Sequence, residues 1–84
     1  MGYYYFKCRS VTYAQRASKL LRGKGIYTGI VKLPLRYSED GCGYSLKVSE
    51  RQFLNAKKLL DDADYEIKRI YFSENNGEYK EVML

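Results

Sequence analysis

The chain has 84 residues, enough for one domain with one hydrophobic core and too short for two. Its 45% hydrophobic and 30% charged residues are typical of a globular protein and exclude a disordered or collagen-like chain. The 15 Lys and Arg against 10 Asp and Glu give a net charge of +5. The basic residues are distributed along the chain, so we interpret the excess as favouring solubility over an anionic partner.

The cysteine and histidine content limits the kinds of catalysis and metal binding that the protein can support. The two cysteines are Cys8 and Cys42, and the sequence has no histidine, the commonest general base and zinc ligand. We therefore expect no metal and no cofactor, and a conventional enzyme is not favoured. The N-terminal aromatic run is interrupted at Lys7, which argues against secretion and a membrane span. We expect a cytoplasmic protein with reduced cysteines.

The first part of the chain predicts a strand followed by a helix. Residues 2–9 are rich in aromatic side chains and indicate a strand, whose core-facing side chains by alternation are Tyr4, Phe6 and Cys8. Ser10 or Thr12 can cap a helix that runs to about Lys24. Its apolar side chains recur at helical spacing: Ala14, Ala17, Leu20 and Leu21. The segment 23–25 ends the helix, because one of its two glycines can take the left-handed conformation.

The middle of the chain predicts two strands joined by a long loop. Residues 26–33 are rich in β-branched side chains, and Pro34, the only proline, ends this strand. Residues 43–48 alternate cleanly, with the inward side chains Tyr44, Leu46 and Val48. The loop between the two strands carries Cys42.

The last part predicts a helix and one or two strands. Ser49 and Gln52 have the spacing of a capping box. The helix that follows runs to about Ala63, with a buried stripe of Phe53, Ala56, Leu59, Leu60 and Ala63. Residues 65–73 indicate a fourth strand. Asn76-Gly77 is a preferred hairpin turn, which would return residues 78–84 as a fifth strand; a frayed polar terminus is the alternative. We therefore divide the chain into a domain, 1–74, and a tail, 75–84.

The order of these elements predicts the fold. Strand, helix, strand, strand, helix, strand is the ferredoxin-like split β-α-β arrangement (βαββαβ) of the α+β class. Its single antiparallel sheet carries both helices on one face. The opposite, open face of the sheet would then carry Tyr3, Tyr5, Lys32, Ser45 and Lys47.

This topology gives Cys42 a distinctive position. The first strand ends, the first helix begins and the second strand ends at one edge of the sheet, so the loop should lie near the helix N-terminus. The positive end of the helix dipole favours a thiolate there and lowers the pKa of a cysteine. Gly41 and Gly43 let the backbone approach the sulfur, and Arg36 and Arg9 can add positive charge. Glu39 and Asp40 oppose this effect unless they point outward.

Cys8 ends the first strand at the same edge and is a candidate second thiol. The first and third strands are neighbours in this fold, so a Cys8–Cys42 disulfide or a transfer between the two sulfurs is one interpretation. The other is that Cys8 is a small buried core residue, and we favour it.

The residues around this loop resemble a known family. The strand with Phe6, the helix start at residues 10–14, the Gly25-Ile26 strand entry and above all Pro34…Arg36-Tyr37-Ser38…Cys42-Gly43 resemble the putative selenium/sulfur carrier protein-like family. The resemblance covers residues 3–72 and implies a small bacterial domain that is cytoplasmic. It implies that Cys42 holds sulfur or selenium as a persulfide or perselenide, with Gly43 as its partner and Pro34 shaping the loop. It also implies donor and acceptor proteins as partners.

The sequence departs from the family pattern in two places. The spacer Glu39-Asp40-Gly41 is longer and more acidic than usual, and the tail with Asn76-Gly77 is an extension. The longer spacer affects the geometry expected at the sulfur. The extension suggests a contact with a partner or with a second copy of the chain.

Two alternatives involve no chemistry at Cys42. The open face could bind single-stranded nucleic acid, because tyrosines interleaved with lysines suit base stacking and phosphate contact. We rank this below the carrier, since the usual strand motif of RNA-binding domains is absent. A regulatory module that self-associates through the tyrosine-rich face or the C-terminal edge strand is the other alternative.

Overall fold

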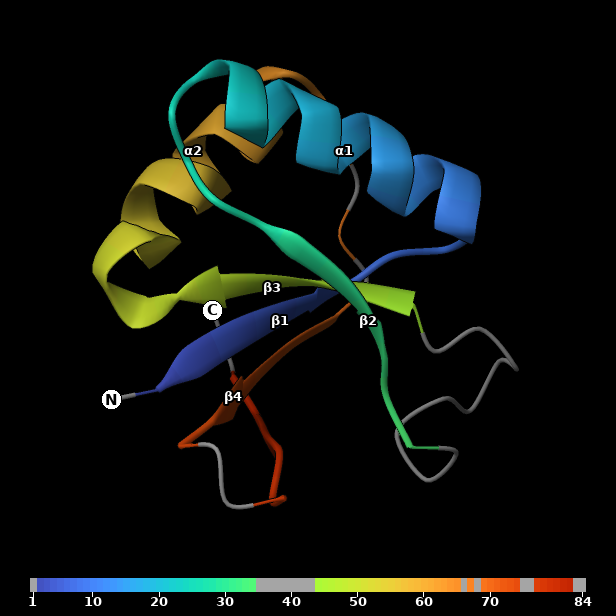
Figure 1. Ribbon diagram of the computed structural model, residues 1–84, viewed down its shortest axis with the longest axis vertical. Coiled ribbons are helices and arrows are strands. Elements are labelled where there is room, and N and C mark those ends of the chain that lie inside the picture. The colour runs from blue at the N-terminus through green and yellow to red at the C-terminus, as the bar shows by residue number, and fades with distance from the viewer. Residues whose placement is uncertain (1, 35–43, 66, 68, 75–76, 83–84) are drawn as a thin grey trace.

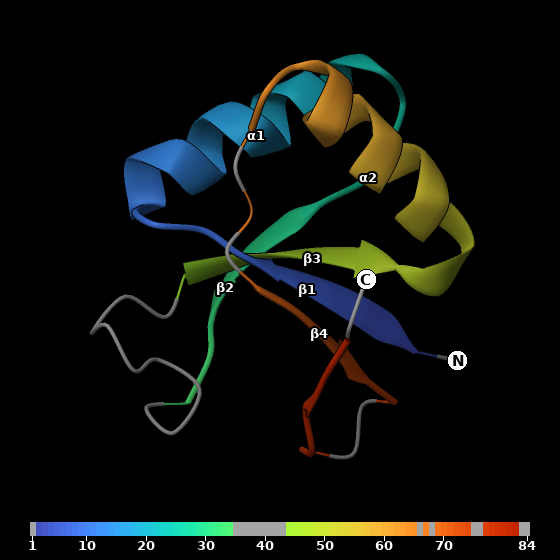
Figure 2. The same cartoon turned by 180° about the vertical axis from the view of Figure 1, so that it is seen from behind.

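The computed structural model describes residues 2–34, 44–65, 67, 69–74 and 77–82. It is an α+β fold in two layers, an antiparallel sheet and two helices that cover the same face of it (Figures 1 and 2). Over the described residues the sheet has five strands in the order β2-β3-β1-β4-β5. The elements are β1 (Tyr3–Lys7), α1 (Val11–Gly23), β2 (Gly29–Lys32), β3 (Tyr44–Ser49), a 3₁₀ turn η2 (Glu50–Gln52), α2 (Phe53–Asp62), β4 (Arg69–Ser73) and β5 (Lys80–Glu81).

Both ends of α1 follow from local sequence. The Ser10 hydroxyl accepts a hydrogen bond from the Tyr13 N–H at 3.1 Å, so Ser10 rather than Thr12 is the cap. At the other end Gly25 takes the left-handed conformation with φ +83°. The N–H groups of Gly25 and Ile26 donate to the carbonyls of Arg22 (3.0 Å) and Leu21 (2.9 Å), a Schellman motif. The predicted helix and its glycine stop are confirmed.

The main core lies between the sheet and the helices. Phe6, Leu21, Leu46 and Leu60 are at most 1% exposed and bring together β1, α1, β3 and α2. Tyr4 stacks on Phe53 with 3.8 Å between ring centroids, which fixes the start of α2 against β1. The predicted core positions Cys8, Ala14, Ala17, Val48 and Ala56 are fully buried as well.

The beginning of α2 differs from the prediction. The Ser49 side chain makes no capping hydrogen bond, and the η2 turn precedes the helix. The Glu50 carboxylate instead accepts a hydrogen bond from the Gly2 N–H at 2.9 Å, and the Glu50 N–H donates to the Gly2 carbonyl at 3.2 Å. Glu50 thus ties the start of β1 to the end of β3, a long-range contact that the capping-box pattern does not anticipate. Ala63, predicted in the buried stripe, lies beyond the helix and is exposed.

The C-terminal strands are shorter than predicted. β4 covers residues 69–73 of the predicted 65–73, although Tyr65 and Ile67 still pack against the core. The chain then returns, and β5 pairs with β4 through Tyr71↔Glu81 and Phe72↔Lys80. A fifth strand was predicted for residues 78–84, and it is confirmed for two residues. Asn76, in the predicted turn, lies outside the described residues, and Gly77 has φ +83°.

The sheet face without helices is not the open face that the sequence predicted. Tyr5 is 4% exposed and Ser45 is 0% exposed. Tyr5 belongs to a second, smaller cluster with Leu33 and Tyr71, and Tyr79 on the returning chain packs edge-on against its ring at 5.1 Å. Of the five residues expected on this face, Tyr3 and Lys47 are half-buried, and Lys32 is exposed but lies on the opposite face, since its neighbours Val31 and Leu33 belong to the second cluster. The correction arises because the predicted tail returns to the sheet.

Neither helix, in the parts of the chain that the structure describes, is long and apolar enough to cross a membrane.

The two glycines at the end of α1 allow a matched test of this fold. Neither would have a heavy atom within 4 Å of an added Cβ, so each alanine substitution acts through the backbone alone. We expect Gly25→Ala, at φ +83°, to lower the free energy of unfolding by about 1–2 kcal/mol. We expect Gly23→Ala, inside the helix, to raise it by up to about 1 kcal/mol. Urea unfolding followed by circular dichroism measures both, and equal stability of the two variants would contradict the assignment.

Candidate functional site

The candidate site lies at one end of the strands, where β1 and β2 end and β3 begins. We call this end of the sheet the strand edge. The register pairs Lys7 with Ser45 and Lys32 with Tyr44, so the three strand ends lie side by side. The Cys8 N–H donates to the Tyr44 carbonyl at 2.9 Å, and α1 begins three residues after Cys8. The predicted meeting of the strand ends and the helix start at one edge is confirmed.

The residues expected to perform chemistry lie mostly outside the described residues. Cys42, Gly41, Gly43 and Arg36 belong to the segment 35–43, so their roles stay predictions. Pro34 is described and is exposed, one residue after the buried Leu33. It follows the end of β2, as expected for a residue that cannot donate to a sheet ladder.

Cys8 is a core residue at this edge. Its side chain is 0% exposed, and its Sγ donates a hydrogen bond to the Phe6 carbonyl at 3.5 Å. It packs in the cluster formed by β1, α1 and β3. A thiol in this position fills space as a small hydrophobic side chain and presents no sulfur to a partner.

The N-terminus of α1 gives this edge a positive electrostatic character. The first turn of the helix contains no acidic side chain, so the helix dipole is not offset there by a carboxylate of its own. The Arg9 guanidinium lies over the Tyr13 ring, 4.7 Å from its centroid, and Tyr13 packs edge-on against Tyr65 at 5.3 Å. An anion near this helix end is therefore stabilised by the dipole and by a positioned cation.

Two polar residues, Lys7 and Ser45, are buried at this edge, and the sequence pattern does not predict it. Alternation in β1 places Lys7 on the face opposite Phe6, yet Lys7 is 3% exposed, between Ser45 on β3 and the half-buried Arg69 on β4. The Ser45 hydroxyl is fully buried and has no hydrogen-bond partner among the described residues. The available signal was the central place of β1 in the expected sheet, which gives its side chains neighbours on both sides.

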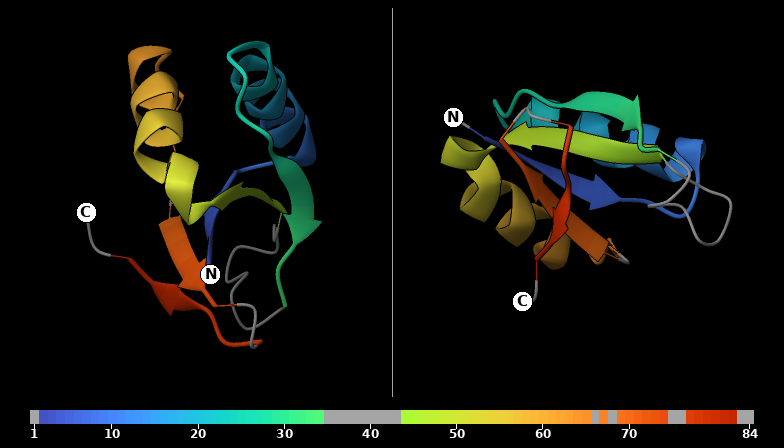
Figure 3. Two further views of the ribbon diagram at one scale, coloured as in Figure 1. Left: turned by 60° about the vertical axis from the view of Figure 1, so that its left-hand side comes forward. Right: turned by 90° about the horizontal axis from the view of Figure 1, so that it is seen from below.

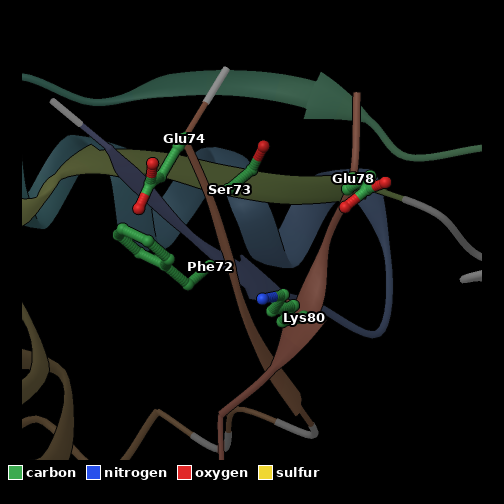
Figure 4. A pocket seen from close by; sticks show the side chains of 5 residues that line it. All are labelled: Phe72, Ser73, Glu74, Glu78 and Lys80. Carbon is green, nitrogen blue, oxygen red and sulfur yellow. The ribbon is translucent and has the colours of Figure 1, made fainter. Parts of the chain in front are cut away.

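A second hollow lies in the β4–β5 hairpin, away from this edge. It is lined by Phe72, Ser73, Glu74, Glu78 and Lys80 (Figure 4). The carboxylates of Glu74 and Glu78 do not converge on one point in this view. Within the described ranges no group of three or more His, Cys, Asp or Glu side chains could hold a metal ion. This hollow therefore does not compete with the strand edge as the candidate site.

Burial raises the pKa of Tyr5 above its ordinary 10.0, and the charges of Tyr79 and Tyr3 and a hydrogen bond with Tyr79 act in the same direction. The folded protein thus holds this proton more tightly than the unfolded chain. Its contribution to stability is complete below the unfolded pKa and is lost as the pH rises through the folded pKa. Above about pH 10 we expect the free energy of unfolding of the wild type to fall more steeply than that of Tyr5→Phe. Urea titrations at neutral and alkaline pH measure this difference, and parallel curves would contradict the burial of Tyr5.

The burial of Cys8 predicts a selective chemical protection. In native buffer Cys42→Ser, which retains only Cys8, should take up almost no iodoacetamide, and it should take up one label per chain in urea. Mass spectrometry at timed intervals measures the labelling. Cys8→Ala, which retains only Cys42, is the matched comparison. Native labelling of Cys42→Ser as fast as in urea would show that Cys8 is accessible.

Comparison with known proteins gives one positive result. The chain matches no curated protein and no solved structure. A family model described as "Putative Se/S carrier protein-like" matches residues 3–72, which extend from β1 into β4 and include Cys8, Pro34 and Cys42. The strand β5 lies outside the matched range. The resemblance found in the sequence is thereby confirmed, and the chain belongs to the Se/S carrier protein-like family.

Proposed function

We propose that the protein is a sulfur or selenium carrier and that the sulfur of Cys42 accepts the transferred atom. The observation that carries the proposal is membership of the family described as "Putative Se/S carrier protein-like", over a range that includes both cysteines. Cys8 is fully buried, and this supports assigning the acceptor role to Cys42.

The strand edge supports a position for the sulfur near the N-terminus of α1. Cys42 is two residues from Tyr44, so covalent geometry keeps their Cα atoms within about 7 Å. The Tyr44 carbonyl is hydrogen-bonded to the Cys8 N–H, and Ser10 caps α1 two residues later. The helix dipole and the Arg9 guanidinium then favour the thiolate form of Cys42, which is the nucleophile.

The neighbouring residues have supporting roles in this proposal. Gly41 and Gly43 allow the backbone N–H groups to approach the sulfur, and Arg36 adds a positive charge. Pro34 ends the preceding strand and sets where the loop begins.

The transfer is a thiol exchange at a persulfide. The Cys42 thiolate attacks the outer sulfur of a donor persulfide, a new S–S bond forms, the donor's S–S bond breaks, and the donor cysteine leaves as a thiolate. No net oxidation occurs, because one persulfide is exchanged for another. An acceptor nucleophile then attacks the outer sulfur in turn, and the Cys42 thiolate leaves. The perselenide follows the same steps with selenium as the transferred atom.

We also infer the ferredoxin-like arrangement for residues 3–73, with β5 as an added edge strand. The chain order β1, α1, β2, β3, α2, β4 supports it, as do the antiparallel neighbours in the order β2-β3-β1-β4. We place the carrier in the cytoplasm, where the reducing conditions keep a thiol available.

The test is the intact mass of the protein after incubation with a cysteine desulfurase and cysteine. We expect the wild type and Cys8→Ala each to gain sulfur, and Cys42→Ser to gain none, because its remaining thiol, Cys8, is fully buried. The added mass should disappear on reduction with a thiol reagent. A selenocysteine lyase with selenocysteine, in place of the first pair, tests selenium in the same way.

Two outcomes would disprove the proposal. One is a wild type that gains neither sulfur nor selenium from either donor system. The other is equal addition to Cys42→Ser, which would place the acceptor elsewhere in the chain.

A further inference from the structure

The acidic residues are divided unevenly along the chain, whereas the basic residues occur throughout it. The first 38 residues contain eight basic residues and no acidic one. All ten acidic residues follow, together with seven basic ones. The excess of positive charge therefore belongs to the segment that forms β1, α1 and β2.

In the folded protein the two segments of the chain place their helices on different sides of the molecule. α1 lies over the β2 side of the sheet and α2 over the β4 side (Figure 3). The exposed basic residues of the first side are Arg9, Arg16, Lys19, Arg22, Lys24 and Lys32. The second segment exposes acidic and basic residues together: Glu50, Asp61, Asp62, Asp64, Glu74, Glu78 and Glu81 with Arg51, Lys58 and Lys80. A surface of this kind attracts an anion to the α1–β2 side at long range.

A groove lies on the basic side, at the end of the sheet where β2 begins and β3 ends. Its lining includes Tyr3, Tyr27, Val31, Lys47 and Gln52, and its volume is about 400 Å³. We call it the tyrosine groove. It lies at the opposite end of the strands from Cys8 and Tyr44, because Tyr3 begins β1 and pairs with Ser49 at the end of β3.

The groove continues past Gln52 into a neighbouring hollow. Lys24, at the end of α1, and Lys58, on α2, line this hollow, which has a volume of about 510 Å³, and Asp62 is its one acidic lining residue. The two hollows together therefore form a cationic path around this end of the molecule.

The two tyrosine rings that line the groove each lie beside a cation. The Tyr27 side chain is 78% exposed, the largest exposure among the large hydrophobic side chains of the described residues. The Arg22 guanidinium lies 5.6 Å from the Tyr27 ring centroid and donates to the Thr28 carbonyl at 2.6 Å, which holds it there. The Lys47 ammonium lies 4.2 Å from the Tyr3 ring centroid. Exposed rings beside fixed cations suit a ligand with flat aromatic groups and regular negative charge.

We propose that the tyrosine groove binds single-stranded nucleic acid. A base stacks on the exposed face of Tyr27, and Arg22, Lys47, Lys24 and Lys58 neutralise the flanking phosphates. An acidic protein segment would satisfy the cations but supplies no partner for the Tyr27 ring, so the observations favour the nucleic acid. This site shares Tyr3 and Lys47 with the sheet face considered from the sequence, but its exposed ring is Tyr27, because Tyr5 and Ser45 of that face are buried.

The test is the fluorescence anisotropy of a labelled single-stranded RNA of about 12 nucleotides, long enough to span one such site. We expect binding that weakens with added salt. Tyr27→Ala should weaken it about 5- to 150-fold, the effect of losing one stacked base. Lys24→Gln and Lys58→Gln should each weaken it and lower the slope of log affinity against log salt by about 0.7.

Two substitutions at exposed sites away from the groove are matched controls. Leu54→Ala removes a side chain that is 76% exposed on α2, and Lys80→Gln removes a charge from β5. Both should bind RNA as the wild type does. Circular dichroism melting of each variant checks that it is folded, and Tyr27→Ala should fold normally because its side chain is exposed.

Three results would overturn the proposal. The first is no RNA binding at low salt, and the second is wild-type affinity of folded Tyr27→Ala. The third is displacement of the RNA by poly-glutamate at equal charge concentration, which would indicate an acidic protein partner instead. RNA binding by Cys42→Ser separates this site from the carrier proposal, because that variant should lose sulfur uptake and keep its affinity for RNA.

Discussion

The pairing of β1 with a strand on each side is the constraint on which the rest of the structure depends. All five of its residues are in register with β3 and, at the same time, with β4. One face of β1 places Phe6 beneath both helices, and the other places Tyr5 in the second cluster. A one-residue slip would exchange these two sets of side chains, so burial on both faces fixes the register. The ends of β1 then determine which residues meet at each end of the sheet.

The features that the sequence predicted well are those that depend on neighbours in the chain. Ser10 reaches an N–H three residues away, and Gly25 takes a conformation that side chains disfavour. Phe6 and Cys8 follow from simple alternation in a strand. Ser49 has the same kind of local pattern and fails, because Glu50 is engaged by Gly2, 48 residues away in the sequence. A local capping pattern therefore predicts the structure correctly unless a residue distant in the sequence makes a competing contact.

The parts of the candidate site that the sequence did not predict depend on packing between distant segments. Lys7 and Ser45 are buried because β1 lies in the middle of the sheet, and Tyr5 is covered by Tyr79, which comes from the returning chain. Residues 80–81 pair with β4, and the alternation of side chains within the first strand does not predict this pairing. The absence of acidic residues before position 39 was visible in the sequence. Its effect on the surface charge becomes clear only from the fold, which places α1 and β2 on one side of the molecule.

The length of β1 separates the two ends of the sheet. Four residue steps divide Tyr3 from Lys7, which at the rise of an antiparallel strand is about 14 Å. A partner held at the tyrosine groove therefore covers one end of the sheet and leaves the strand edge beside Tyr44 accessible. The two ends also differ in kind. The N-terminus of α1 and the Arg9 guanidinium make one end suitable for a compact anion, whereas Tyr27 and four spaced cations suit the other end to an extended one. A small sheet can thus offer sites to two anionic partners of different shape, because the two ends of α1 lie near opposite ends of the strands.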